Sequence, residues 1–324
     1  MGETDMIGEE KVIIVDHLTK DYGHGRGVFD VSFIVHKGEV FGFLGPNGAG
    51  KSTAIRHIMG FSRPQSGQTL VNGLESFGNY YKLLEDVGYL PGEIALPEGL
   101  TGWEFIQMMS DLRHCKDRKR LDYLLEKFEL NPAGETKKMS LGDKRKLAIV
   151  TAFMADPNVL ILDEPTSGLD PVMQQVFIDF IKEEKKRGKT ILLSSHMFNE
   201  VEATCDRISI IKDGRIVSTF DTNDIKHNQD KNFKVQFKDK KNYQKFVASL
   251  PRKRKDALTV KTPSISSCDN KGLWAVVAIN DKFVDKFISL LGEYDIAKFE
   301  EIKFTIEDYF MQFYHEDKKF GGVL

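Results

Sequence analysis

Residues 45–53 read GPNGAGKST; an apolar run at 40–44 comes directly before them, and a helical pattern covers 51–59. Glycines let such a loop fold so that its backbone N–H groups point at phosphate oxygens, helped by the positive end of the following helix. Strand, glycine-rich loop and helix in this order predict a phosphate-binding loop. The residues expected to contact the bound molecule are Gly45, Asn47, Gly48, Gly50, Lys51, Ser52 and Thr53.

Two side chains of this loop and two carboxylates elsewhere have specific chemistry. Lys51 is expected to reach the β and γ phosphates, and the hydroxyl of Ser52 is expected to ligate Mg²⁺. A second apolar run, 159–162, ends in Asp163 and Glu164. Asp163 is expected to hold Mg²⁺ at the carboxyl edge of the sheet, and Glu164 to accept a proton from an attacking water.

The pattern of the first 220 residues predicts an α/β class with several buried strands. Short apolar runs without alternation indicate buried strands, and longer amphipathic segments indicate helices. Lys212-Asp-Gly214 predicts a hairpin turn. Strands are expected at 12–15, 31–35, 40–44, 159–162, 190–193, 207–211 and 215–220, and helices at 51–59, within 101–153 and at 172–186.

A polar stretch at 221–231 predicts a linker, and the remaining residues follow another order of elements. Their pattern is strand, helix, strand, strand, helix, strand, which is the ferredoxin-like arrangement. We therefore expect a nucleotide-binding domain at 1–225, with a mainly helical part at about 93–155, and an accessory α+β domain at 226–324. The expected strands are 233–237, 258–261, 273–279 and 296–303, and the expected helices are 243–250 and 282–291.

Composition excludes some classes of protein. The 324 residues carry a formal net charge of −2 and a pI near 6.5, which argues against a globally basic nucleic-acid binder. Cys115, Cys205 and Cys268 are scattered without metal spacing, as expected of reduced thiols in a cytosolic protein. No apolar run approaches the roughly 18 residues of a membrane span, and the N-terminal stretch lacks the layout of a signal peptide. A role at a membrane would require a partner.

On the basis of these motifs, the chain resembles the ATP-binding subunits of ABC transporters, from about Val12 to Phe220. Further segments match the family in order and spacing. Tyr22, in DYG at 21–23, resembles the aromatic residue that stacks on adenine. SGLD at 167–170, which ends in Asp170, resembles the D-loop, and His196, in SSH at 194–196, resembles the switch histidine that contacts the γ-phosphate.

Two segments depart from the family pattern. The signature, usually LSGGQ, reads MSLGD at 139–143. Ser140 and Gly142 keep the hydroxyl and the close backbone approach that the γ-phosphate of a partner subunit requires, and this form resembles the bacterial ABC-2-type branch of exporters of drugs, antimicrobial peptides or lipids. In VGYLPGE at 87–93, Gly92 occupies the place of the usual Q-loop glutamine, and Glu93 is a candidate to supply the lost oxygen.

The resemblance implies a P-loop ABC cassette, with a mixed core sheet and a helical subdomain, that binds ATP and Mg²⁺ and hydrolyses ATP. It implies a dimer, homo- or heteromeric, in which two subunits sandwich two ATP molecules, and an integral-membrane permease that recruits the cytoplasmic subunit to the inner face of the membrane. No nucleic-acid partner is expected. Export is the favoured direction. The alternatives are an importer ATPase with a C-terminal solute-sensing domain and a soluble ABC ATPase without a transport role.

Overall fold

The structure is a computed structural model that describes residues 10–115, 117–222, 230–251, 263–302, 306–307 and 310–311. The chain divides into two compact units, Met1–Thr222 and Asn223–Leu324, here called unit 1 and unit 2. Each unit has its own hydrophobic core, and each is described by itself.

Unit 1 contains an antiparallel sheet in the order β2-β1-β4-β5. Its long strands β1 and β2 form a hairpin, in which Gly23 pairs with Arg26 next to the turn. The inward side chains of β1 are apolar and buried, which fixes the face that this sheet turns to the core. The bounds are β1 Lys11–Gly23, β2 Arg26–His36, β4 Ser66–Val71 and β5 Leu74–Glu75.

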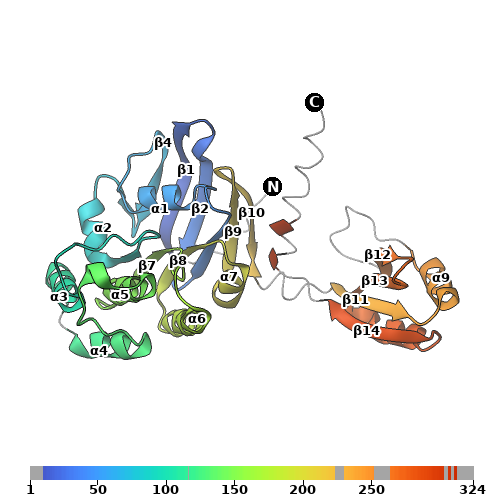
Figure 1. Ribbon diagram of the computed structural model, residues 1–324. Helices are drawn as coiled ribbons and strands as arrows, with labels where there is room; N and C mark the ends of the chain where they lie inside the picture. Colours follow the sequence, from blue (N-terminus) through green and yellow to red (C-terminus); the bar gives the residue numbers. More distant parts are fainter. Residues whose placement is uncertain are drawn as a thin grey trace. The chain divides into compact units, whose positions relative to one another are not determined.

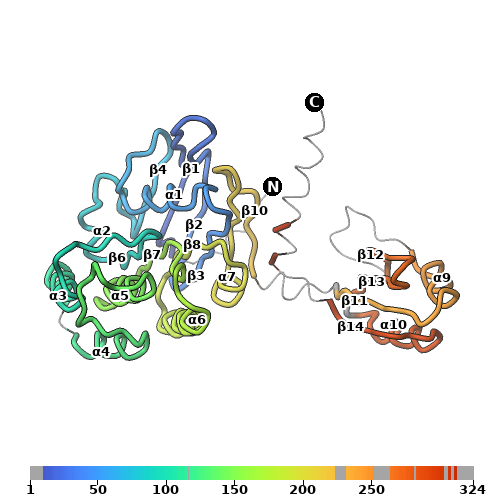
Figure 2. Tube along the Cα trace, in the orientation of Figure 1, coloured from blue at the N-terminus to red at the C-terminus, as the bar shows by residue number. Residues whose placement is uncertain are grey.

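The second sheet of unit 1 has the order β10-β9-β3-β8-β7-β6. Five of its strands are parallel, and only β10 joins antiparallel, through the hairpin with β9. Figure 2 traces β6, β7, β8 and β3 one after another across the middle of the unit. β3, β7 and β8 are buried throughout, as expected of parallel strands covered on both faces. The bounds are β3 Val40–Leu44, β6 Val87–Leu90, β7 Val159–Asp163, β8 Thr190–Ser195, β9 Arg207–Lys212 and β10 Arg215–Asp221.

Helices of unit 1 begin at residues suited to helix caps. Thr101 and Glu104 form a capping box on α3, and the side chains of Asp117, Ser140 and Asp170 cap α4, α5 and α6. Helices α3, α4 and α5 gather away from β1, β2 and β4 (Figure 1). The bounds are α1 Lys51–Ile58, α2 Tyr80–Asp86, α3 Gly102–Leu112, α4 Arg118–Lys127, η1 Thr136–Lys138, α5 Leu141–Phe153, α6 Pro171–Lys186 and α7 Phe198–Thr204.

Unit 2 is a four-stranded antiparallel sheet in the order β12-β13-β11-β14. Its first and third strands lie at the centre, which is the ferredoxin-like arrangement. Phe246 of α9 and Phe287 of α10 lie in one core with Phe233, Val235 and Phe237 of β11. The bounds are β11 Asp230–Phe237, α9 Lys240–Ser249, β12 Ser264–Asp269, β13 Trp274–Asn280, η2 Asp281–Phe283, α10 Val284–Leu291 and β14 Ile296–Ile302.

The predicted class, an α/β cassette followed by a small α+β domain, is confirmed. The run 258–261, predicted as a strand, lies outside the described residues. Strand β12, Ser264–Asp269, was not predicted. That strand reads SISSCD, so its polarity hid it from a search for apolar runs. Strand β6 was also not predicted, because its four residues include a glycine and a tyrosine.

Candidate functional site

The loop after β3 has the backbone conformation of a phosphate cradle. Gly48 and Gly50 have φ of 83° and 107°, a region that side chains disfavour. A Cβ at Gly45 would lie 2.4 Å from the carbonyl oxygen of Ile211. Residues larger than glycine would therefore distort the turn. Gly50 is the N-cap of α1, so the free N–H groups of the helix point into the loop.

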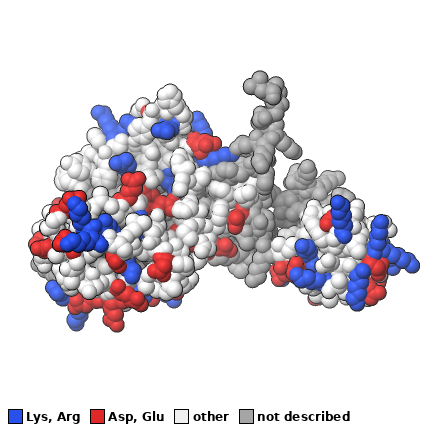
Figure 3. Space-filling view, in the orientation of Figure 1, with Lys and Arg blue, Asp and Glu red and all other residues white. Residues whose placement is uncertain are grey.

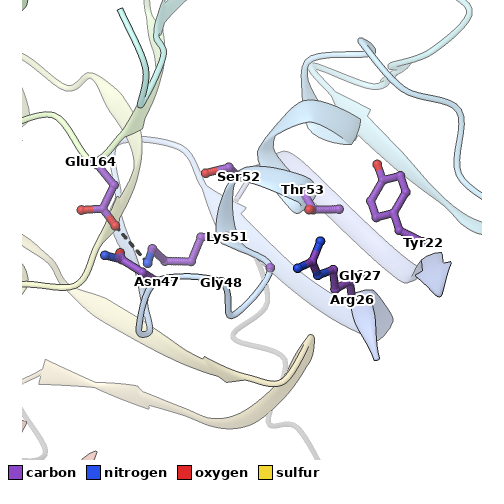
Figure 4. A pocket seen from close by; sticks show the side chains of 10 residues that line it. Tyr22, Arg26, Gly27, Asn47, Gly48, Lys51, Ser52, Thr53 and Glu164 are labelled. Atoms are coloured by element: carbon purple, nitrogen blue, oxygen red, sulfur yellow. Dashed lines mark ion pairs between the residues drawn. The ribbon is translucent and has the colours of Figure 1, made fainter. Parts of the chain in front are cut away.

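Lys51 is folded back over this loop and is only 5% exposed. Its ammonium group donates to the carbonyl oxygens of Gly45 and Pro46, over 2.6 and 3.1 Å. It also forms an ion pair with Oε1 of Glu164 at 2.9 Å (Figure 4). The residues predicted to bind phosphate and to activate water are thus in direct contact.

The carboxyl ends of β7 and β8 bring further polar side chains to the same edge of the sheet. Asp163 ends β7, is buried, and accepts a hydrogen bond of 2.5 Å from the hydroxyl of Ser194 on β8. Glu164 has a φ of 48°, and its N–H donates to the carbonyl oxygen of Ser194 over 3.1 Å. Oε2 of Glu164 lies 2.6 Å from Nδ1 of His196. Parallel pairing therefore places both carboxylates and the histidine together.

A cavity of about 560 Å³ extends from this edge toward the β1–β2 hairpin. Figure 4 shows Glu164 and Lys51 at one end and Tyr22 at the other, with Ser52 and Thr53 between them. Tyr22 is 55% exposed, so much of its side chain is accessible to a ligand in the cavity. The full lining is Tyr22, Arg26, Gly27, Asn47, Gly48, Gly50, Lys51, Ser52, Thr53 and Glu164.

The hairpin turn contributes residues that the sequence analysis did not find. Arg26 and Gly27 line the cavity, and the carbonyl oxygen of Gly27 is within 2.9 Å of the position that a Cβ would take at Gly50. The hairpin thus lies directly against the phosphate loop. The pairing of Asp21 with Gly27 brings Arg26 back beside Tyr22 once the hairpin forms, and residue type alone gave no signal of this.

Comparison with known proteins identifies this arrangement. The family model described as "ABC transporter" matches residues 28–167. The uncharacterized ABC transporter ATP-binding protein YhcH of Bacillus subtilis is 34% identical over 224 residues, which are 68% of this chain and 72% of that protein. The chain belongs to the ABC transporter ATP-binding family. It is therefore an ATP-binding subunit with ATPase activity.

Other relatives and solved structures agree. The linearmycin resistance ATP-binding protein LnrL of Bacillus subtilis is 38% identical, over 63% of this chain and 67% of that protein. A solved ATP-binding subunit of an ABC transporter is 32% identical, with a TM-score of 0.62 over 67% of this chain and 92% of that one. The ADP- and phosphate-bound dimer of the cassette MJ0796, at 22% identity and a TM-score of 0.59 over 65% and 98% of the two chains, supports the fold alone.

The family's other motifs lie outside the cavity lining. Ser140 is the N-cap of α5, and its hydroxyl accepts from the N–H of Asp143 and donates to the carboxylate of Asp143 over 2.7 Å. Asp170 caps α6, and its hydrogen bonds to the backbone, chiefly that from Met173, lower its pKa. Gly142 lies beside Gly168: a Cβ on Gly142 would be 3.4 Å from the carbonyl oxygen of Gly168. Signature and D-loop are therefore neighbours within one chain.

The Q-loop position has a main-chain contact in place of a side chain. A Cβ at Gly92 would lie 3.1 Å from Oδ2 of Asp163, so a side chain at this position would start directly beside this carboxylate. Glu93 is exposed and does not line the cavity. The neighbouring Tyr89 stays protonated, because burial, aided by the charge of Asp163, raises its pKa to about 12.

The residues present fit ATP and Mg²⁺. The cavity joins an aromatic face to a glycine cradle with a buried ammonium group, as a nucleoside triphosphate requires. One hydroxyl, that of Ser52, and one carboxylate, that of Asp163, suit an ion that keeps its other ligands as water and phosphate oxygens. Among the described residues, no group of three or more acidic, histidine or cysteine side chains could hold a metal by itself.

Proposed function

We propose that this chain is the motor subunit of an ABC exporter, in which two ATP-binding units hydrolyse Mg-ATP and drive a separate integral-membrane permease from the inner face of the membrane. The observation that carries the hydrolytic part is the contact of one carboxylate, Glu164, with both Lys51 and His196. The export direction is supported by the Ser-Leu-Gly signature and by relatives named for linearmycin resistance and, as probable, multidrug transport.

In this proposal, Tyr22 stacks on adenine, and the loop N–H groups with Lys51 bind the phosphates. Arg26 provides a second cation beside the phosphate loop. Ser52 and Asp163 hold Mg²⁺, which supplies neutralisation of the charge that develops on the transferred phosphoryl group. Because Asp163 is held by Ser194, its carboxylate is oriented before any nucleotide binds.

Glu164 acts as the general base. Its backbone has a left-handed φ and is fixed by the hydrogen bond to Ser194, so the carboxylate is aimed at the end of the phosphate loop. The imidazole of His196 holds one oxygen, which orients the other toward Lys51. A base positioned in this way contributes roughly 10²–10⁴-fold to the rate.

The second unit of the motor supplies the Ser140 segment across the sandwich. Leu141, in place of the first signature glycine, is 64% exposed, and Val172 near the D-loop is 70% exposed. Exposed apolar side chains beside a nucleotide site support burial against another subunit. The related cassette MJ0796 is dimeric in its solved structures.

An exposed aromatic surface around α2 supports the proposal that the chain binds a permease. Phe61 packs edge-on against Tyr89, and Gly60 lies against Tyr80, so these residues share one surface. Aromatic clusters of this kind usually mark contacts with other proteins. In the part of the chain described, no helix is long and apolar enough to cross a bilayer. The exposed members are Phe61, Phe77, Tyr80, Tyr81 and Leu84.

On the face drawn in Figure 3, the described residues do not gather positive charge along one surface. Lys and Arg side chains lie among Asp and Glu on both units (Figure 3). A nucleic-acid face would gather one sign of charge along one surface. This mixture and the net charge of −2 support a protein and membrane setting for the subunit.

The proposal is tested by phosphate release and by membrane co-purification. Lys51→Ala should abolish turnover, since it removes the charge that binds the phosphates. Glu164→Gln should retain ATP binding, slow turnover by roughly 10²–10⁴-fold, and trap a dimer in gel filtration with ATP and Mg²⁺.

Wild-type turnover in Lys51→Ala would refute the site. Co-purification should identify a polytopic protein with the subunit, and ATP should drive transport by that complex into inside-out vesicles. ATP-driven movement in the opposite direction would refute export and favour the importer.

A further inference from the structure

Arg145 is a buried cation that donates hydrogen bonds to main-chain oxygens of two separate loops. It lies in the second turn of α5 and is 3% exposed. Nε donates to the carbonyl oxygen of Ser167 over 2.8 Å, Nη1 to that of Pro91 over 2.9 Å, and Nη2 to that of Gly92 over 2.6 Å. All three guanidinium nitrogens are thus bound to backbone.

Both loops lie close to acidic residues of the nucleotide site. Gly92 lies beside Asp163, because a Cβ on Gly92 would be 3.1 Å from Oδ2 of that carboxylate. Ser167 donates its N–H to the carbonyl oxygen of Glu164 over 3.1 Å. Arg145 therefore holds, from one helix, the segments next to the metal-side carboxylate and next to the base.

The charges around Arg145 also indicate that its guanidinium lies near Asp163 and Glu164. Burial lowers its pKa, while the charges of Asp163 and Glu164 act in the opposite direction. The half-buried Arg120 has a different environment, because it pairs with the carboxylate of Glu184 at 2.9 Å. The guanidinium of Arg145 lies near the two catalytic carboxylates but is bonded to carbonyl oxygens, so it positions the loops without neutralising either acid through a direct bond.

We infer that Arg145 is a positioning residue that couples the Ser140 segment to the loops at Asp163 and Glu164. It lies five residues after Ser140 on the same helix, so a shift of either loop acts on the start of α5. This inference rests on the proposed function, in which Ser140 serves the nucleotide of the other subunit. Arg145 then transmits the state of one nucleotide site to the segment that completes the opposite site.

The chemistry of arginine suits this task. Its planar fork presents fixed donors to two adjacent carbonyl groups, whereas a lysine ammonium is a point charge without that geometry. At Gly92 no side chain is present to bind neighbouring groups, and the main-chain contact with Arg145 anchors the loop instead. Removal of the Arg145 guanidinium should therefore release the Pro91–Gly92 loop without removing any group that is proposed to touch ATP.

The test compares Arg145→Gln and Arg145→Lys in the full chain with the matched control Arg120→Gln. Arg120 is a half-buried arginine on helix α4 of unit 1, with its side chain 10% exposed, and it pairs with Glu184 on α6. Both Arg145 variants should lower kcat by roughly 10–100-fold, as a small misplacement of catalytic groups does, with ATP affinity near the wild-type value. Arg120→Gln should lower the thermal midpoint but keep kcat.

A second readout separates coupling from loss of stability. In the Glu164→Gln background, ATP should drive dimer formation when Arg120→Gln is added and should fail to do so when either Arg145 variant is added, as measured by sedimentation. If Arg145→Gln is insoluble, Arg145→Lys gives both readouts. Wild-type kcat, or an ATP-driven dimer as strong as that of the control, in a folded Arg145 variant would overturn the inference. Turnover by Lys51→Ala would instead overturn the proposed function.

Discussion

Gly92 places backbone, not a side chain, against Asp163. We expect Gly92→Ala to lower turnover several-fold, because its Cβ needs room beside a carboxylate that is buried and held by Ser194. Glu93→Ala should leave turnover near wild type, since Glu93 is exposed. Steady-state phosphate release as Mg²⁺ is varied measures both effects. The opposite result, a sharp loss only with Glu93→Ala, would assign the missing oxygen to Glu93.

Glu200 is buried, accepts a hydrogen bond from the hydroxyl of Ser195, and should make stability depend on pH. Burial raises its pKa to about 7, with the charge of Glu164 adding and the hydrogen bond from Ser195 opposing. The folded pKa lies above the ordinary 4.5, so its contribution to stability is complete below that value and is lost as pH rises through 7. Glu200→Gln should therefore raise the thermal midpoint at pH 8 but hardly at pH 5.

Calorimetry at the two pH values checks this, with exposed Glu126→Gln as the control. For a domain of this size, each kcal/mol shifts the midpoint by roughly 2–4 °C. Equal shifts for Glu200→Gln at both pH values would show that Glu200 stays ionised inside the fold.

At the scale of elements, the start of α5 carries a charge that the usual signature glutamine lacks. Asp143 binds the Ser140 hydroxyl, where the phosphate of a second subunit would approach. Asp143→Asn keeps the cap but removes the repulsion between like charges. We expect it to tighten the ATP-driven dimer of Glu164→Gln by about tenfold, or about 1.4 kcal/mol.

The matched control is Asp117→Asn, the same change at the cap of α4. It should leave the dimer affinity unchanged in sedimentation experiments. If both substitutions tighten the dimer equally, the effect is one of net charge and not of the signature position.

Elements whose residues repeat a clear pattern could be predicted, and contacts between distant loops could not. The buried strands at 40–44 and 159–162 and the phosphate loop were predicted from apolar runs and glycines, and the structure has them in place. Strand Ser264–Asp269 is polar and was missed. Arg26 and Arg145 were missed because their roles depend on a hairpin closing and on backbone carbonyls, neither of which leaves a mark in residue type.

At the scale of the whole molecule, the residues assigned to ATP chemistry all lie in unit 1, and unit 2 has a core of its own. We predict that residues 1–225 alone fold and bind ATP with affinity changed by less than about tenfold, or about 1.4 kcal/mol. Association between subunits should change instead. Nucleotide titration and sedimentation on the truncated chain measure the two properties. A soluble truncated chain that cannot bind ATP would make unit 2 part of the motor.

The ion pair between Lys51 and Glu164 bears on how much ATP the resting subunit would hydrolyse. In the proposed function, the Glu164 oxygen that is held by the buried Lys51 ammonium cannot at the same time bind the attacking water, so water is not activated while the pair persists. A phosphate chain that draws Lys51 to itself frees the base in the same event. In the proposed function, Glu164 therefore becomes free to bind water only after a nucleotide has bound, which would limit ATP hydrolysis between transport cycles.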